Sequence, residues 1–142
     1  MTIISQKEWV ALLMQGVTPF NAFRNNWRTK AINIMQMDFS GDNLSNVDFR
    51  EANFRNVDFN GVNFYRANFN SATFRDGNFR DADFRDADLS AVHFYNSDLT
   101  GADLRGADLS FTSFVGKCTL NKIKISKEQK ANFMTAMGIS IY

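Results

Sequence analysis

The chain has 142 residues, a net charge of +1 and a single cysteine. This length suits one domain, and one cysteine excludes an internal disulfide. The sequence contains neither a run of about 18 apolar residues nor a basic and then apolar amino terminus, so we expect no membrane span and no signal peptide. We therefore expect a cytoplasmic protein, because a chain without disulfides suits a reducing compartment.

The charges are unevenly distributed along the chain. Residues 38–116 contain 13 acidic residues and 7 arginines, a net charge of −6. The rest of the chain contains 9 basic and 2 acidic residues, a net charge of +7. This distribution excludes a uniformly basic nucleic-acid-binding protein, so we expect no direct nucleic-acid contact.

The first predicted element is a helix over residues 6–14. Ser5 and Glu8 have the spacing of a capping box, and Gly16 follows the apolar stretch. Four aromatic residues in and after this helix form either a partner-binding patch or a cover over the next element, and we favour the cover. These residues are Trp9, Phe20, Phe23 and Trp27.

Large apolar residues then recur at every fifth position through the middle of the chain. A period of five matches neither a helix nor a strand, so these residues cannot mark one face of either element. Self-similarity at a fixed spacing is instead the signature of a repeat architecture. The predicted core is formed by Phe39, Leu44, Phe49, Phe54, Phe59, Phe64, Phe69, Phe74, Phe79, Phe84, Leu89, Phe94, Leu99, Leu104, Leu109 and Phe114.

The other positions of each five-residue unit are also restricted. Two residues before the large residue comes a small residue or valine, as at Ala52 and Val57. One residue before it comes Asp or Asn in thirteen of the sixteen units. If the chain turns a corner once per unit, large and small residues can point inward together. The Asp and Asn side chains can then bond to the backbone of the turn.

The units at residues 82–86 (Ala-Asp-Phe-Arg-Asp) and 102–106 (Ala-Asp-Leu-Arg-Gly) resemble the pentapeptide-repeat family of bacteria, including cyanobacteria. The resemblance extends roughly over residues 31–125. It implies an all-β fold, a right-handed quadrilateral β-helix of about five coils that stack at about 4.8 Å. We expect a single domain with a capping helix and leader over residues 1–30, the β-helix over 31–125, and a capping helix and tail over 126–142.

Beyond Phe114 the five-residue register slips by one. The segments Cys118-Thr119-Leu120 and Ile123-Lys124-Ile125 continue it only if one residue is inserted near Lys117. We interpret these segments as an irregular capping coil, because the last coil of a repeat protein needs a cover.

The last predicted element is a helix from Ser126 to about Met137. Ser126 and Gln129 again have the spacing of a capping box, and Gly138 follows. The apolar face of this helix can cover the last coil, or it can pair with a second copy about a two-fold axis. The resemblance implies the second use, because relatives dimerise through their C-terminal ends. We favour a monomer and keep the homodimer open.

Neither His93 nor Cys118 has the companions that catalysis requires. His93 occupies an outward Asp/Asn position, and we interpret it as a turn residue. Cys118 occupies a small inward position, where an inert buried thiol is expected. The sequence contains no phosphate-binding glycine loop, zinc-ligand spacing or catalytic triad pattern, so we expect no enzyme activity, no cofactor and no metal.

Charged columns form the candidate interaction surface. Residues twenty apart stack in a four-cornered coil, so like charges come one coil apart. The acidic columns could bind a row of cations or imitate the phosphates of DNA. We favour a structural role instead, in which the carboxylates accept hydrogen bonds from N–H groups of the turns. We expect the arginines of the neighbouring columns to form ion pairs with Asp76, Asp81 and Asp86. The candidate surface consists of Arg55, Arg75, Arg85, Arg105, Asp83, Asp88, Asp103 and Asp108.

The sequence favours a non-enzymatic scaffold that binds another protein through its exposed side chains. The alternative is a DNA mimic that acts on DNA gyrase or a related topoisomerase, as the resemblance to quinolone-resistance proteins implies. Such mimics are strongly acidic, whereas arginines interrupt the acidic columns of this chain.

Overall fold

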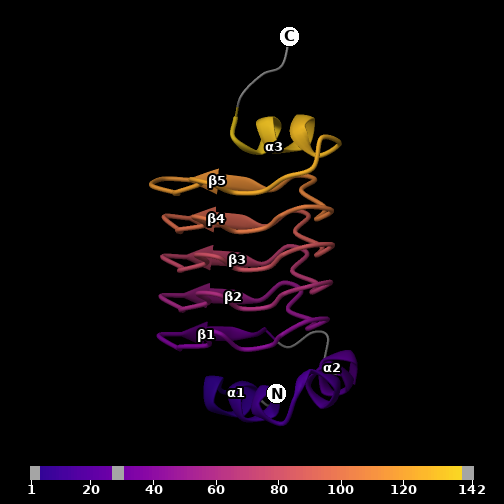
Figure 1. Cartoon of the computed structure of the whole chain (residues 1–142). Coiled ribbons are helices and arrows are strands. Elements are labelled where there is room, and N and C mark those ends of the chain that lie inside the picture. Colours follow the sequence, from indigo (N-terminus) through magenta and orange to yellow (C-terminus); the bar gives the residue numbers. More distant parts are fainter. Residues whose placement is uncertain (1–3, 27–30, 139–142) are drawn as a thin grey trace.

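The computed structural model describes residues 4–26 and 31–138. The chain forms a stack of coils, with two helices at the N-terminal end and one at the C-terminal end (Figure 1). One side of the stack is a parallel sheet in the order β1-β2-β3-β4-β5. The strands are β1 (Asn33–Met35), β2 (Asn53–Arg55), β3 (Thr73–Arg75), β4 (His93–Tyr95) and β5 (Ser113–Val115).

Each coil has four sides, and we call the side formed by the five strands the strand face. Three further ladders of backbone bridges run up the stack, beginning with the pairs Asp38↔Asp58, Asn43↔Asn63 and Asp48↔Asn68. We call these sides bridge faces 1, 2 and 3 in that order. Since these three pairs and the paired residues of β1–β5 are all twenty residues apart, the predicted four-cornered coil is confirmed, with four complete turns between β1 and β5.

The large residue of every unit points into the stack. Fifteen of the sixteen predicted core residues are buried, and Phe114 in the last coil is half-buried. The rings form columns, in which Phe74 stacks on Phe54 at 5.1 Å and on Phe94 at 5.2 Å. Each buried Phe stabilises the fold by roughly 1.5–3 kcal/mol, so these columns are its main source of stability.

The corner of each unit lies at the second residue after the large one. This residue has a positive φ in seventeen consecutive units from Gln36 to Gly116, as at Asn56 (φ 50°) and Asp76 (φ 54°). Left-handed backbone disfavours most side chains, and eleven of these seventeen residues are Gly, Asn or Asp. This repeated reversal of backbone direction is what makes a five-residue unit turn.

Helices α1 (Gln6–Met14) and α2 (Val17–Asn26) lie under the first coil (Figure 1). The predicted boundaries of α1 and its capping box are confirmed, with the Ser5 N–H donating to Glu8 Oε2 at 2.8 Å. Helix α2 was not predicted from the sequence. Trp9 and Phe20 are fully buried, and Phe20 meets the core residue Phe49 at 5.4 Å. These two aromatics therefore cover the first coil, as favoured, while Trp27 lies outside the described residues.

Side chains of the N-terminal helices also bind the exposed backbone edge of the first coil. The Gln6 side chain donates to the Met35 carbonyl at 2.9 Å and accepts from the Met35 N–H at 2.8 Å. Asn21 accepts from the Asp48 N–H at 2.8 Å, and the buried Arg24 donates to the Arg50 carbonyl at 2.5 Å. These contacts protect an edge that is otherwise open to another strand.

The structure confirms the register slip in the last coil. Asp98 is bridged to Thr119, and Asp103 to Lys124, so each pair is twenty-one residues apart. One extra residue follows Gly116, as the pattern predicted. The Lys117 N–H donates to the Asn96 side chain at 2.9 Å, which fixes this insertion.

The C-terminal helix is shorter than the sequence predicted. Helix α3 spans Lys130–Ala136 rather than starting at Ser126, and residues 127–129 form a turn. The Ser126 N–H donates to Gln129 Oε1, as in a capping box, but Gln129 Nε2 donates to the carbonyls of Leu104 (2.5 Å) and Ala107 (2.8 Å). Gln129 is thereby fixed to the end of the β-helix, and α3 begins only after it. None of the described helices is long and apolar enough to span a membrane.

Candidate interaction surface

On the three bridge faces, the Asp/Asn side chains bond to their own turns. In each of the twelve units from Asp38 to Asp108 on these faces, Oδ1 accepts the N–H of the residue two positions later. The distance is 2.9 Å, for example, from the Asn60 nitrogen to Asp58. These side chains therefore belong to the scaffold, which confirms the structural interpretation of the Asp/Asn position.

The strand face follows a different rule. The three units without Asp or Asn at this position have Thr73, His93 and Ser113 there, and all three lie in strands β3, β4 and β5. Residues of a parallel strand bond to the neighbouring strands, so no side chain is needed to close a turn. The outward residues of the strand face therefore do not have to close a turn.

The arginines of bridge face 2 bind the aspartates of their own units. Arg85 binds both carboxylate oxygens of Asp83 at 2.9 and 2.7 Å, and Arg105 binds Asp103 at 2.9 and 2.6 Å. The hydrogen bond from the Arg105 side chain holds the pKa of Asp103 below its usual range. Such bidentate, charge-assisted pairs are geometrically specific.

The prediction that the arginines pair with Asp76, Asp81 and Asp86 is therefore wrong. Within the described residues, none of these three carboxylates lies within 4 Å of an arginine. The carboxylate two residues earlier is already turned toward the arginine backbone, as in the 3.0 Å bond from the Arg85 N–H to Asp83. The guanidinium of the same residue therefore reaches that carboxylate first.

Asp88 and Asp108 on bridge face 3 are also engaged locally. They stack in register, as predicted, and each accepts a backbone N–H at 2.9 Å, from Ser90 and Ser110 respectively. The hydrogen bonds from Ser110 hold the pKa of Asp108 below its usual range. These aspartates have the structural role that we favoured over a cation ladder.

Arg55 and Arg75 are the members of the candidate surface that keep no carboxylate partner. Both are exposed, and they lie side by side in β2 and β3. Within the described residues, neither forms an ion pair. The Arg75 guanidinium lies 4.3 Å from the ring centroid of Tyr95 in β4, a cation–π contact that holds both side chains in place.

A second column of the strand face is formed by polar side chains. Asn53 donates to Asn33 at 3.2 Å, and His93 Nδ1 lies 2.7 Å from the Ser113 hydroxyl. His93 is exposed on this ladder, as its outward position predicted. Sequence reasoning missed Tyr95 as a surface residue, although its position twenty residues after Arg75 was a usable signal.

In the part of the chain that the structure describes, no other arrangement of reactive side chains stands out. The Cys118 thiol is half-buried rather than buried, and its sulfur lies 3.4 Å from the carbonyl oxygens of Phe94 and Val115. Across residues 4–26 and 31–138, no group of three or more His, Cys, Asp or Glu residues could hold a metal ion.

Solved structures that are similar to this chain include two from pentapeptide repeat proteins. A pentapeptide repeat protein from the Arabidopsis thaliana thylakoid lumen is 30% identical, with a TM-score of 0.49 over 61% of this chain and 57% of that one. HetL, involved in heterocyst differentiation regulation in the cyanobacterium Nostoc sp. strain PCC 7120, is 22% identical, with a TM-score of 0.47 over 65% of this chain and 38% of HetL.

A third similar structure is QnrB1, a plasmid-mediated fluoroquinolone resistance protein. It is 19% identical, with a TM-score of 0.34 over 78% of this chain and 70% of QnrB1. No curated protein matches the chain. The model of the pentapeptide repeat region matches residues 47–125, which is more than half of the sequence. This chain therefore belongs to the pentapeptide repeat family.

Proposed function

We propose that this protein is a non-enzymatic scaffold in the cytoplasm that binds another protein through its strand face. The observation that carries the proposal is the division of labour among the four faces. On the bridge faces the Asp/Asn side chains close their own turns, whereas the outward side chains of β1–β5 have no such task.

The composition of the strand face supports this use. Arg55, Arg75 and Tyr95 form one continuous column, and Arg and Tyr are the residue types most enriched at energetic hot spots of interfaces. The stacking of Arg75 on Tyr95 reduces the entropy that these side chains lose on binding. A sheet face with an ordered column of this kind suits a protein partner.

A pair of double variants tests the proposal. The full chain is used to capture proteins from an extract of its source organism, and captured proteins are quantified by mass spectrometry. We expect Arg55→Gln/Arg75→Gln to lose specific partners that Arg85→Gln/Arg105→Gln retains, because only the second pair is already bound to aspartates. Equal capture by both double variants would contradict the proposal.

The alternative function, a DNA mimic acting on gyrase, receives less support from the surface. The column that includes Asp83 and Asp103 is neutralised by bidentate arginines, so it does not offer an unbroken row of negative charge. A supercoiling assay with purified gyrase decides the matter. A mimic inhibits or protects the enzyme at low micromolar concentration in a salt-dependent way, and no effect at tenfold excess rejects it.

A further inference from the structure

The two ends of the β-helix are closed in different ways. At the N-terminal end, Trp9 and Phe20 are fully buried on the core, and Gln6 pairs with the edge of β1. At the C-terminal end, Phe133 of α3 meets Phe114 at 6.0 Å. The apolar residues of that end are nevertheless only half-buried: Phe114, Cys118, Leu120, Ile123, Ile125 and Phe133.

Three large apolar side chains at this end are exposed. Phe111 is 88% exposed, Val115 43% and Met137 39%. Phe111 also occupies the left-handed corner position, with a φ of 59°. It is the one aromatic residue among the positive-φ residues of the described chain. Both its exposure and its backbone conformation are unfavourable for folding, so its presence points to a use in binding.

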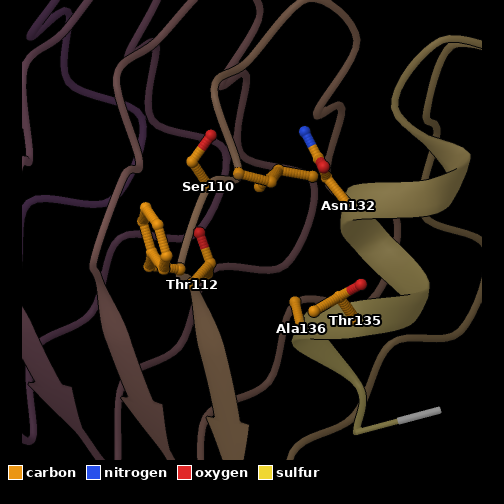
Figure 2. Close-up of a pocket in the computed structure, with 7 residues that line it drawn as sticks. Ser110, Thr112, Asn132, Thr135 and Ala136 are labelled. Carbon is orange, nitrogen blue, oxygen red and sulfur yellow. The ribbon is translucent and has the colours of Figure 1, made fainter. Parts of the chain in front are cut away.

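A groove lies directly beside Phe111. It has a volume of about 210 Å³ and separates residues 109–112 of the last coil from α3. Figure 2 shows Ser110 and Thr112 on one side, and Asn132, Thr135 and Ala136 of α3 on the other. The groove therefore combines an apolar floor with polar groups that can orient a bound segment.

The same end of the molecule is strongly basic. Residues 117–130 contain five lysines and one glutamate, a net charge of +4, whereas residues 31–116 contain no lysine. All five lysines are exposed, and no ion pair among the described residues includes a lysine. The five are Lys117, Lys122, Lys124, Lys127 and Lys130.

We propose that the C-terminal end, with Phe111 and the adjacent groove at one corner of the last coil and the five lysines spread over residues 117–130, docks an acidic segment of a partner protein that carries large apolar side chains. Protein interfaces usually combine apolar contacts with polar and charged groups. The charge favours an acidic segment over a second copy of this chain, because two copies docked end to end would bring two clusters of +4 together. This surface is separate from the strand face, and neither proposal depends on the other.

The lysines also have a simpler use, since lysine at a sheet edge discourages aggregation. That use accounts for the charge, but it leaves the exposure of Phe111 unexplained, because an unsheltered phenylalanine promotes aggregation. The variant Phe111→Asn separates the two roles. Asn tolerates a positive φ, so this variant keeps the fold, with thermal stability equal to or above that of the wild type.

The test uses the full chain and a phage-displayed library of random twelve-residue peptides, with the enriched peptides then synthesised. We expect the enriched peptides to combine Asp or Glu with Phe, Leu, Tyr or Trp. Their binding should weaken at least tenfold with Phe111→Asn and with Lys122→Glu/Lys124→Glu, and should weaken as salt rises. The strand-face double variant Arg55→Gln/Arg75→Gln serves as the matched control and should bind as the wild type does.

Several outcomes would overturn the proposal. These are enrichment of no peptide, enrichment of peptides without acidic residues, and peptide binding unaffected by the Phe111 and lysine variants. Sedimentation equilibrium and vesicle co-sedimentation test two other occupants. A dimer at micromolar concentration that Phe111→Asn dissociates would assign the surface to a second copy. Binding to phosphatidylglycerol vesicles that the same variant abolishes would assign it to a lipid surface.

Discussion

The side-chain amide of Gln6 pairs with both backbone polar groups of Met35, and so takes the place of a strand below β1. A glutamine on a helix thus closes the first edge of the sheet. The edge of β5 lies at the opposite end of the stack, where α3 gives a less complete cover (Figure 1).

The Gln6 contact can be removed without changing the core. Gln6→Leu should lower the free energy of unfolding by about 1–3 kcal/mol, because two backbone groups lose their partners. Amide hydrogen exchange at Met35 should accelerate, while exchange at the Phe94 amide in β4 stays protected. Unchanged exchange at Met35 would show that the edge does not depend on Gln6.

The inward assignment of the large residues predicts a sharp contrast between neighbours. Phe74 is fully buried between two rings, so Phe74→Asp should cost roughly 5 kcal/mol or more and leave the protein unfolded in circular dichroism. Arg75→Ala, one residue away on the exposed side, should change the free energy of unfolding by less than about 0.5 kcal/mol.

Ala87→Phe should lower the free energy of unfolding by about 1–3 kcal/mol, because it overpacks an inward position. Similar stability of all three variants would contradict the inward assignment.

Acid should weaken the turns of the bridge faces. Hydrogen bonds lower the folded-state pKa of Asp103 and Asp108, so their contribution is fully present above the unfolded value near 4. That contribution is lost as the pH falls through the lowered folded-state values. Urea titrations should therefore show a decreasing free energy of unfolding from about pH 5 to pH 3.

Asp108→Asn isolates one of these groups. Asn keeps an acceptor for the Ser110 N–H but does not titrate, so the variant should lose less stability on acidification than the wild type. Asp108→Ala, which also removes the acceptor, should cost about 1 kcal/mol at neutral pH. An identical pH dependence of wild type and Asp108→Asn would argue against a lowered pKa for Asp108.

Two corner glycines differ in their surroundings and should differ in tolerance. A Cβ at Gly106 (φ 76°) would lie 2.1 Å from an oxygen of Asp86, one coil below, whereas Gly61 (φ 65°) has no heavy atom within 4 Å of that point. Gly61→Ala should cost about 1 kcal/mol for the backbone alone, and Gly106→Ala clearly more. Chemical denaturation of both variants measures the difference, and adding Asp86→Gly to Gly106→Ala should remove it.

The resemblance to the pentapeptide-repeat family implied the twenty residues per coil, whereas the sequence by itself determined the repeat, the inward residues and the single insertion near Lys117. These features follow from the spacing of the apolar residues, because the large residues can all be buried together only if the chain turns once per five-residue unit. The first helix was also predictable, because the Ser5–Glu8 capping box is local. Because the first coil of a β-helix has an open end, the sequence also predicted that Trp9 and Phe20 cover it.

Only the tertiary structure decided which surface side chains are free. In the sequence Arg85 lies two residues after Asp83 and directly before Asp86, and the direction of the turn selects Asp83. The sequence also shows that three units lack Asp or Asn before the large residue. Only the strand pairing shows that these residues, Thr73, His93 and Ser113, lie on one face. Pairing and exposure depend on where a bent backbone aims each side chain relative to the coils above and below, and residue spacing alone carries no such direction.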